Sequence, residues 1–312
     1  MQTIKLSYPH DFKKENLSET VVAIGFFDGV HEGHQTVIRK AVEIAEETGR
    51  ECAVMTFYPH PSVILRKDAE KVHYISTLAE KEVIMEELGV DRLYIVTFNK
   101  DLSQLSPRQF LQHFIHDLQI SHMVAGFDYT FGHKGAGNMD NIKEHTQEPL
   151  ELTVIKQISH EESKVSSTSI RTALKEGDVS RAHTLLGRPY SAIGTVIKGD
   201  QRGRTLGFPT ANLQIDEDKL LPKVGVYAVK VMYEGKEYKG MANIGYKPTF
   251  RDDMVIPSVE VYILDFDEMI YGEELTVYWH TFIRSEQKFN GVDEIITQLQ
   301  TDEKNVRKYF SN

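Results

Sequence analysis

Apolar and polar positions follow two different rhythms along the chain. In the first half, short and nearly continuous apolar runs alternate with longer segments in which apolar residues recur every three or four positions. The short runs predict buried strands, and the longer segments predict amphipathic helices. Strands of this kind alternating with helices indicate a parallel sheet that is covered on both faces. We therefore predict an α/β domain for the first half.

The elements of this half are marked by their end signals. Gly49 ends one helix, Thr77 and Glu80 suggest a capping box, and Ser106 followed by Pro107 begins another helix. The predicted strands are 21–26, 51–57, 91–98, 121–127 and 150–159, and the predicted helices are 34–49, 77–89, 106–119, 166–177 and 178–187.

After Gly187 the rhythm changes to short strands separated by turn residues, as in an antiparallel barrel or sandwich. The segment "YEGKEY" predicts a hairpin, and residues 291–310 predict one helix or two short ones. The boundary should lie between Leu185 and Tyr190, which gives domains 1–186 and 187–312. The predicted strands are 190–199, 225–233, 236–245, 257–266 and 274–283.

Composition agrees with two folded domains. The chain has 312 residues, of which 40% are apolar and 26% charged, and domains average about 150 residues. The formal net charge of −10 argues against a broad nucleic-acid surface. The longest apolar run, "VVAIGFF", is too short to span a bilayer, the first residues lack a signal-peptide core, and Cys52 is the only cysteine. These features predict a cytoplasmic protein that does not bind membranes.

The stretch "AIGFFDGVHEGHQ" contains the most informative candidate residues. A predicted strand ends here and a helix is expected to begin near Gly33, so His31 and His34 would lie at a helix N-terminus, where anions bind. Gly29 and Gly33 allow a close approach of backbone to ligand. Two histidines alone make a poor zinc site. The residue types leave phosphate contact and ordinary loop residues both open.

Two further segments carry polar groups after predicted strands. In "VSSTSIR", Ser167, Thr168 and Arg171 begin a helix and suit phosphate oxygens, although for this motif alone a Ser or Thr helix cap with an exposed arginine is the better explanation. In "GFDYTFG", Asp128 could bind a ligand hydroxyl and the aromatic residues could flank a flat ring. The alternative is a hairpin-like loop with core aromatics.

In this order, "GFFDGVHEGHQ", "GFDYTFG" and "SSTSIR" resemble the N-terminal module of bacterial bifunctional riboflavin kinase/FMN adenylyltransferases, the prokaryotic FAD synthetases. The segment "GRTLGFPTANL" and those after it are similar to the family's kinase module. The resemblance implies a Rossmann-like α/β nucleotidyltransferase domain, then an antiparallel β-barrel riboflavin kinase domain with a C-terminal helix. It implies that ATP phosphorylates riboflavin to FMN and then adenylylates FMN to FAD, with release of pyrophosphate.

The resemblance also implies roles for residues of the adenylyltransferase site. His31 and His34 would hold ATP phosphates, and His34 would stabilise the transition state. Phe127 and Asp128 would lie on the flavin side. The remaining implied ATP contacts are Gly25, Phe26, Gly29, Ser167, Thr168 and Arg171.

For the kinase site, the resemblance implies that Thr210 and Asn212 bind Mg²⁺ and that Glu260 accepts the proton of the riboflavin hydroxyl. Gly207 and Pro209 would complete the ATP site. Without the resemblance, "GFPTAN" reads as a turn entering a strand, and Glu260 as the polar side of a strand. The implied partners are the small molecules riboflavin, FMN and ATP.

Two positions depart from the family pattern, namely Tyr58 before "PHP" and Glu32 between the histidines. His60 in "PHP" could still approach the nucleotide. Two rival hypotheses remain open. The chain could be a flavin-binding regulator with weak catalysis, or an enzyme in which a single module works.

Overall fold

The computed structural model describes residues 1–12, 17–65, 72–156, 159–160, 163–199, 202–248 and 255–311. The chain forms two compact units, each with its own core. The first comprises Met1–Tyr74 and Leu78–Val165, and the second comprises Ile75–Thr77 and Ser166–Asn312. The expected division of catalytic domains after residue 186 remains a prediction, since the compact second unit begins earlier.

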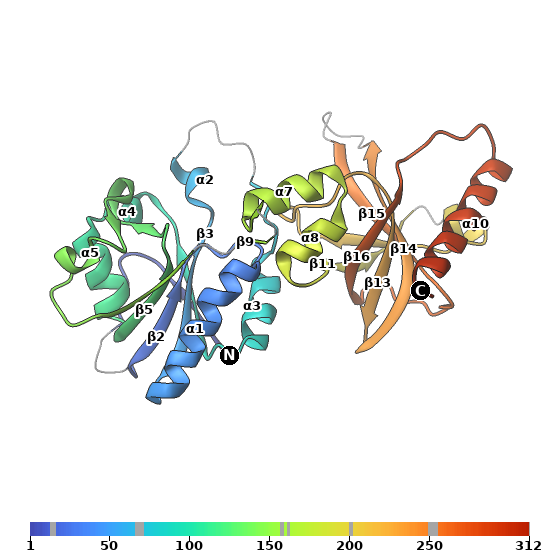
Figure 1. Ribbon diagram of the computed structural model, residues 1–312. Coiled ribbons are helices and arrows are strands. Elements are labelled where there is room, and N and C mark those ends of the chain that lie inside the picture. Colours follow the sequence, from blue (N-terminus) through green and yellow to red (C-terminus); the bar gives the residue numbers. More distant parts are fainter. Residues whose placement is uncertain are drawn as a thin grey trace. The chain divides into compact units, whose positions relative to one another are not determined.

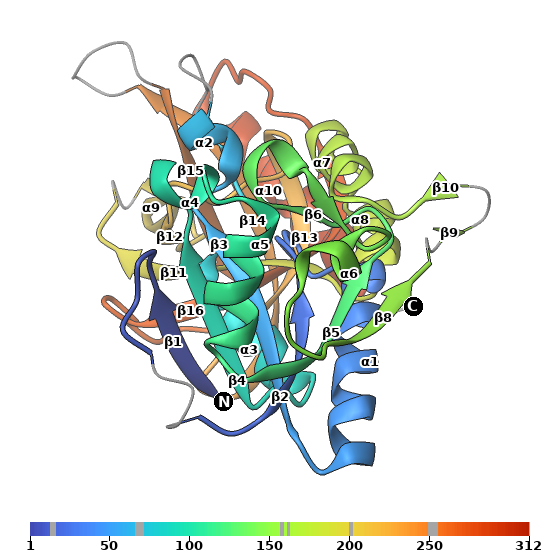
Figure 2. The same cartoon turned by 90° about the vertical axis from the view of Figure 1, so that its left-hand side faces the viewer.

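The first unit is built on an open parallel sheet of six strands in the order β1-β4-β3-β2-β5-β8. Figure 1 labels β2, β3 and β5 of this sheet, and Figure 2 shows β1 at one edge and β8 at the other. The central strand β2 is wholly buried, as its continuous apolar sequence predicted. The strand bounds are β1 Gln2–Leu6, β2 Thr20–Ile24, β3 Glu51–Tyr58, β4 Arg92–Thr97, β5 Ile120–Gly126 and β8 Glu151–Ile155.

Helices cover both faces of this sheet, as predicted. One core joins the sheet to α1, Glu32–Thr48, and α3, Leu78–Glu87. The other joins it to α5, Pro107–Leu111, the π-helical turn η2, Gln112–His116, and α6, Ile142–His145. Smaller elements are α2 Pro61–Leu65, α4 Lys100–Ser103, β6 Thr130–Phe131, η3 His133–Gly135, β7 Gly137–Asn138, β9 Ser159–His160 and β10 Ser163–Lys164.

The second unit is a closed antiparallel barrel in the order β11-β12-β15-β14-β13-β16, which decides between the barrel and the sandwich. The hairpin predicted at "YEGKEY" joins β13 to β14, with Glu234 and Gly235 at positive φ. The strands are β11 Tyr190–Ile197, β12 Ala211–Ile215, β13 Gly225–Tyr233, β14 Lys236–Pro248, β15 Val255–Ile263 and β16 Glu274–Arg284.

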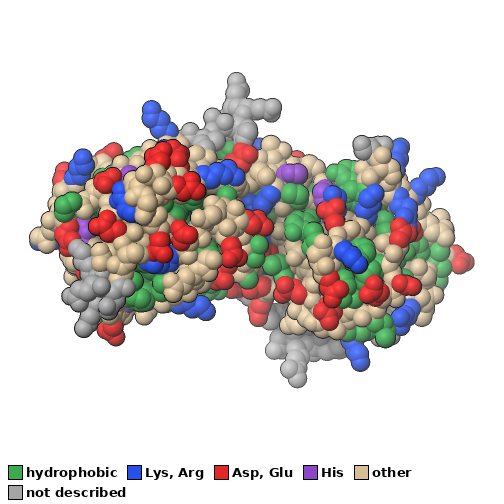
Figure 3. Space-filling model, turned by 90° about the horizontal axis from the view of Figure 1, so that it is seen from below, with side chains coloured by type: hydrophobic (Ala, Val, Ile, Leu, Met, Phe, Trp, Pro, Cys, Tyr) green, Lys and Arg blue, Asp and Glu red, His purple; other side chains and the backbone are tan. Residues whose placement is uncertain are grey.

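Three longer helices accompany the barrel. Helices α7, Ser167–Glu176, and α8, Val179–Leu186, pack on each other, and α8 contacts β11 and β16. The C-terminal segment is one helix, α10, Val292–Tyr309, which packs Val306 into a small core against the barrel. A short helix, α9, spans Arg202–Thr205. On the face in Figure 3, acidic and basic side chains are interspersed.

Several details differ from the sequence prediction. Helix α2 lies outside the predicted helices, and the predicted helix 106–119 is divided into α5 and the π-helical turn η2. Strand β1 was not predicted, because "QTIKL" is short and mostly exposed and pairs only with β4 among the described strands. Helix α1 begins at Glu32 instead of near Gly33, because His31 is its N-cap residue.

Candidate active sites in the two units

The loops after β2 and β5 lie at one edge of the parallel sheet. Ala23 pairs with Val124 in parallel register, so both strands end at the same edge. Gly25–His31 follows β2, and Phe127 and Asp128 follow β5. In open α/β sheets this carboxyl edge is where ligands bind. The structure therefore brings these two sequence-predicted segments to the same carboxyl edge of the sheet.

The loop after β2 has a constrained backbone. Phe27, Gly29 and Val30 have φ values of 50°, 84° and 40°. Phe27 and Val30 are nevertheless buried, with 3% and 0% of their surface exposed. Positive φ in a bulky or β-branched residue is costly, by about 1–3 kcal/mol each, and persists where the surroundings impose it. Such strain is typical of a binding loop.

The two histidines form a stacked pair at the start of α1. The backbone N–H of His34 donates to Nδ1 of His31 at 3.2 Å, and the ring centroids lie 3.5 Å apart with 16° between the planes. A Cβ at Gly33 would stand 3.2 Å from Cε1 of His31, so glycine gives the rings room. The pair lies at the positive end of a helix of 17 residues, which favours anions.

Beside the pair lies a cluster around Phe26 that the sequence did not reveal as a unit. The Phe26 carbonyl accepts hydrogen bonds from Oγ1 of Thr56 and Nζ of Lys81, both at 2.9 Å. The His60 ring meets the Phe26 ring edge to face at 4.6 Å between centroids. His60 donates its backbone N–H to the Tyr74 hydroxyl at 3.0 Å. Only the three-dimensional contacts connect these residues to the loop.

Some aromatic residues of "GFDYTFG" are exposed, as a ligand-binding role requires, and others belong to the core. Phe127 is 47% exposed, and Asp128 is exposed beside it. Phe131 is buried and Tyr129 packs against the same core, where burial raises the pKa of the Tyr129 hydroxyl. Asp128 and Phe127 therefore remain candidates for ligand contact, whereas Tyr129 and Phe131 are structural.

Ser167, Thr168 and Arg171 belong to the second unit, at the start of α7. The N-cap is Ser166, whose side chain forms a reciprocal capping box with Ser169. The helix cap predicted for this motif is therefore Ser166, and not Ser167 or Thr168. Thr168 is exposed on the first turn of the helix.

In the barrel, three polar residues stand in a row across neighbouring strands. Asn212 on β12 is directly opposite Glu260 on β15, and Glu260 is directly opposite Asn243 on β14. Directly opposed residues of antiparallel strands project from the same face, with Cβ atoms about 5 Å apart. Sequence spacing missed Asn243, because only the strand register reveals it.

Close backbone approach shapes the segment "GFPTAN". A Cβ at Gly199 would overlap the carboxamide of Asn212, which is 8% exposed. A Cβ at Gly203 would overlap the Phe208 carbonyl and stand 3.4 Å from Oγ1 of Thr210. Glycine at these two positions therefore allows their close approach to the segment. Gly207 has φ +83° beside open space, and Pro209 is exposed.

The donor set in the barrel fits Mg²⁺. Thr210 offers a hydroxyl oxygen and Asn212 a carboxamide oxygen, which are hard ligands. Mg²⁺ usually takes few protein ligands and completes its shell with waters and substrate phosphates. Within the described ranges, there is no cluster of three or more His, Cys, Asp or Glu residues suited to a metal ion.

An open parallel sheet with a histidine pair at its carboxyl edge, followed by a closed barrel, is the arrangement expected of a nucleotidyltransferase module joined to a small barrel kinase. Comparisons with known proteins agree. A family model described as FAD synthetase matches residues 13–169, and one described as riboflavin kinase matches residues 186–310. The chain belongs to the family of bifunctional riboflavin kinase/FMN adenylyltransferases.

Individual relatives match from end to end. The bifunctional riboflavin kinase/FMN adenylyltransferase of Listeria monocytogenes is 47% identical over 100% of this chain and 99% of its own. That of Bacillus subtilis is 45% identical over the same shares. A crystal structure described as a macrolide-efflux protein from Streptococcus pneumoniae is 35% identical, covers 98% of this chain and 99% of its own, and has a TM-score of 0.88. In the part of this chain that the structure describes, no helix has the length and apolar character to cross a membrane.

Proposed function

We propose that this chain converts riboflavin to FMN and FMN to FAD, with ATP as the second substrate of both reactions. The observation that carries the proposal is the presence of two separate polar constellations. The stacked pair His31–His34 lies at the start of a helix in the first unit, and Asn212 lies opposite Glu260 in the barrel. A flavin sensor needs neither an anion-binding helix end nor a carboxylate beside a magnesium-type donor pair.

In the adenylyltransferase reaction, an oxygen of the FMN phosphate attacks the α-phosphorus of ATP and pyrophosphate leaves. The nucleophile is already an anion, so the protein has to align the reactants and stabilise charge. The location of His31 and His34 at the N-terminus of α1 supports a role in binding the phosphates. His34 would stabilise the transition state. Gly25, Phe26 and Gly29 accommodate the nucleotide.

The other contacts of this site come from the remaining two motifs. Arg171 suits the β- and γ-phosphates because its guanidinium binds phosphate oxygens in a fork, and Ser167 and Thr168 add hydroxyl donors. Phe127 and Asp128 stand exposed after β5 and would meet the flavin.

In the kinase reaction, Glu260 accepts the proton of the riboflavin 5′-hydroxyl while that oxygen takes the γ-phosphoryl group of ATP, and ADP leaves. Thr210 and Asn212 would hold Mg²⁺, which neutralises phosphate charge when bound. Gly207 and Pro209 line the ATP side. The buried carboxamide of Asn212, packed against Gly199, is held in place for this role.

The test is incubation of the purified protein with riboflavin and Mg-ATP, followed by chromatographic separation of the flavins. We expect FMN and FAD to accumulate, and EDTA to abolish both. Starting a parallel sample from FMN isolates the second reaction and detects an enzyme with one working module. If riboflavin is bound but returned unchanged, the regulator hypothesis is correct instead.

We propose that these reactions take place in the cytoplasm, with riboflavin, FMN and ATP as the small-molecule partners. ATP is available there, and the single cysteine, Cys52, is free and buried, so the fold relies on no disulfide.

A further inference from the structure

Lys81 occupies an unusual position for a lysine. It lies in the first turn of α3, where an exposed side chain would be expected, yet 2% of its surface is exposed. Lysine is almost never fully buried unless its charge has partners. Its ammonium donates a hydrogen bond to the Phe26 carbonyl at 2.9 Å and stands 4.7 Å from the centroid of the Phe26 ring. Both contacts join it to the loop after β2.

The point of contact is where the loop leaves the sheet. Phe26 is followed directly by the strained residue Phe27 and, four positions after Phe26, by the strained residue Val30. The Phe26 carbonyl is fixed from β3 by Thr56 and from α3 by Lys81. A charged donor forms a stronger hydrogen bond than a neutral one, and a desolvated cation adds attraction to the ring face. Lys81 therefore opposes relaxation of the strained turn.

Titratable side chains of the loop after β2 and of α3 lie near Lys81 in the sequence or the structure. Asp28, in the same loop, is 3% exposed, and its charge acts on Lys81. His60 lies against the Phe26 ring, and Glu80, the neighbour of Lys81 on α3, is also buried. His31 and His34 follow further along the loop. A buried cation beneath this turn also adds positive potential where a polyphosphate would approach.

We propose that Lys81 is a positioning residue of the adenylyltransferase, whose positive charge holds the turn Phe26–Val30 in the form that receives ATP. This inference rests on the proposed assignment of that turn to the ATP site. Loss of the charge, by substitution or by deprotonation, should slow FAD formation and leave FMN formation unaffected, because the kinase residues lie on the barrel.

The pH dependence of FAD formation distinguishes a role of the Lys81 charge from a merely structural role of its side chain. Burial lowers the pKa of Lys81 to about 8, and Asp28 opposes the shift. The charge is therefore present below pH 8 and is lost above it. The FMN phosphate, with a second pKa of about 6, is already a dianion throughout this range. A decline of FAD formation above pH 8 thus reports on the protein and not on this substrate.

The experiment compares the full-length protein with Lys81→Met, Lys81→Arg and the control Lys143→Met. Lys143 is an exposed lysine on α6 of the same unit. The kcat/KM for ATP is measured between pH 7 and 9.5 for FMN to FAD, and in the same samples for riboflavin to FMN. Values of kcat/KM report on ionisations of the free enzyme.

We expect parental FAD formation to decline with an apparent pKa near 8, while FMN formation does not follow that curve. Lys81→Arg should extend activity to higher pH, because arginine stays charged. Lys81→Met should lower kcat/KM for ATP by about 10- to 100-fold in FAD formation, as expected for a lost charged hydrogen bond. Lys143→Met should match the parent.

A parental profile that is level across this range would overturn the inference, even if no variant folds. So would a folded Lys81→Met with the parental kcat/KM, or a folded Lys81→Arg that keeps the parental decline. Absence of FAD at every pH would instead refute the adenylyltransferase function itself.

Discussion

His31 and His34 are neighbours in space but are held in different ways. Nδ1 of His31 accepts the backbone N–H of His34, so His31 is the N-cap of α1. His34 contributes to that hydrogen bond through its backbone alone. The cap would therefore survive any substitution of the His34 side chain, and catalysis and capping can be separated by experiment.

We predict that His34→Ala lowers FAD formation from FMN by about 10²–10³-fold, as for loss of a donor to developing charge. Conversion of riboflavin to FMN and the melting temperature should stay near parental values. His31→Ala should also lose FAD formation and, in addition, about 1 kcal/mol of stability with its cap. Equal loss of both activities in folded His34→Ala would refute this division.

Glu260 gives the reciprocal prediction. Glu260→Gln preserves shape and removes the base, so FMN formation should fall by roughly 10²–10⁴-fold. FAD formation from supplied FMN should continue. Initial rates of both reactions on one preparation check this, and a parental rate of riboflavin phosphorylation would reduce Glu260 to a strand residue.

At the scale of elements, Gly199, which follows β11, leaves the space that the Asn212 side chain occupies. A Cβ at Gly199 would overlap the Asn212 carboxamide. We predict that Gly199→Ala lowers kinase kcat/KM for Mg-ATP on the order of 10²-fold, as expected for a displacement of about 1 Å. Gly291→Ala is the control, because open space surrounds Gly291. Unchanged kinase kinetics in Gly199→Ala would show that the position of Asn212 does not matter.

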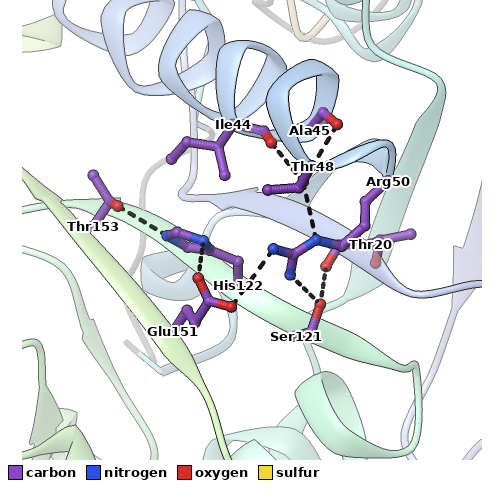
Figure 4. Close-up of polar contacts among 9 residues, drawn as sticks. All are labelled: Thr20, Ile44, Ala45, Thr48, Arg50, Ser121, His122, Glu151 and Thr153. Atoms are coloured by element: carbon purple, nitrogen blue, oxygen red, sulfur yellow. Dashed lines mark hydrogen bonds and ion pairs between the residues drawn. The ribbon is translucent and has the colours of Figure 1, made fainter.

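A second element-scale feature is the polar network near the amino edge of the sheet (Figure 4). His122 on β5 is 8% exposed, contacts Thr153 at 2.8 Å and lies 3.2 Å from a Glu151 oxygen. Arg50 donates to the Ser121 hydroxyl at 2.7 Å. Burial lowers the pKa of His122 below its ordinary 6.5, and Glu151 opposes the shift.

We predict that the first unit loses stability as the pH falls through 6.5, because the unfolded chain then binds a proton that the folded one resists. His122→Asn should flatten this dependence. The only tryptophan, Trp279, lies in the barrel, so its fluorescence follows the second unit. Thermal unfolding by circular dichroism should therefore show the change while the tryptophan signal does not. An unaltered circular dichroism profile would contradict the prediction.

The sequence was sufficient to predict those helices and strands that have a regular apolar spacing and clear end signals. Strand β2 and helix α1 followed from apolar spacing and Gly49. Other features depend on tertiary contact. Val30 adopts a φ that its residue type disfavours, because burial imposes it. Lys81 reads as an exposed helix residue until the Phe26 carbonyl is placed beside it, and the position of Asn243 opposite Glu260 follows from strand register.

At the scale of the whole molecule, the compact unit that contains the barrel also includes α7 and α8, which lie before the domain boundary predicted after residue 186. Lys223 donates its backbone N–H to the Leu174 carbonyl on α7, and Ser180 on α8 donates to the His280 carbonyl of β16. Leu185 and Leu186 of α8 are buried. A kinase fragment that begins after α8 would expose the surface that these residues cover.

We predict that fragment 166–312 folds, converts riboflavin to FMN with Mg-ATP and makes no FAD. Fragment 187–312 should fold with the same activity but be less stable by about 2 kcal/mol or more, because buried leucine contacts are lost. Urea unfolding followed by Trp279 fluorescence measures both. Equal stabilities would show that α7 and α8 do not support the barrel, and a folded but inactive fragment 166–312 would show that the kinase site is incomplete in this half.

The two units also differ in how they expose their strands. The barrel is closed, so every one of its strands has a partner on both sides, whereas β1 and β8 each have one partner in the described sheet of the first unit. An open edge offers unpaired backbone groups to another chain, and closure removes that hazard. Heat-stressed protein should accordingly aggregate edge to edge through the first unit. Peptides protected from protease in such aggregates should come from β1 or β8, and the barrel should be recovered in the soluble fraction after cleavage.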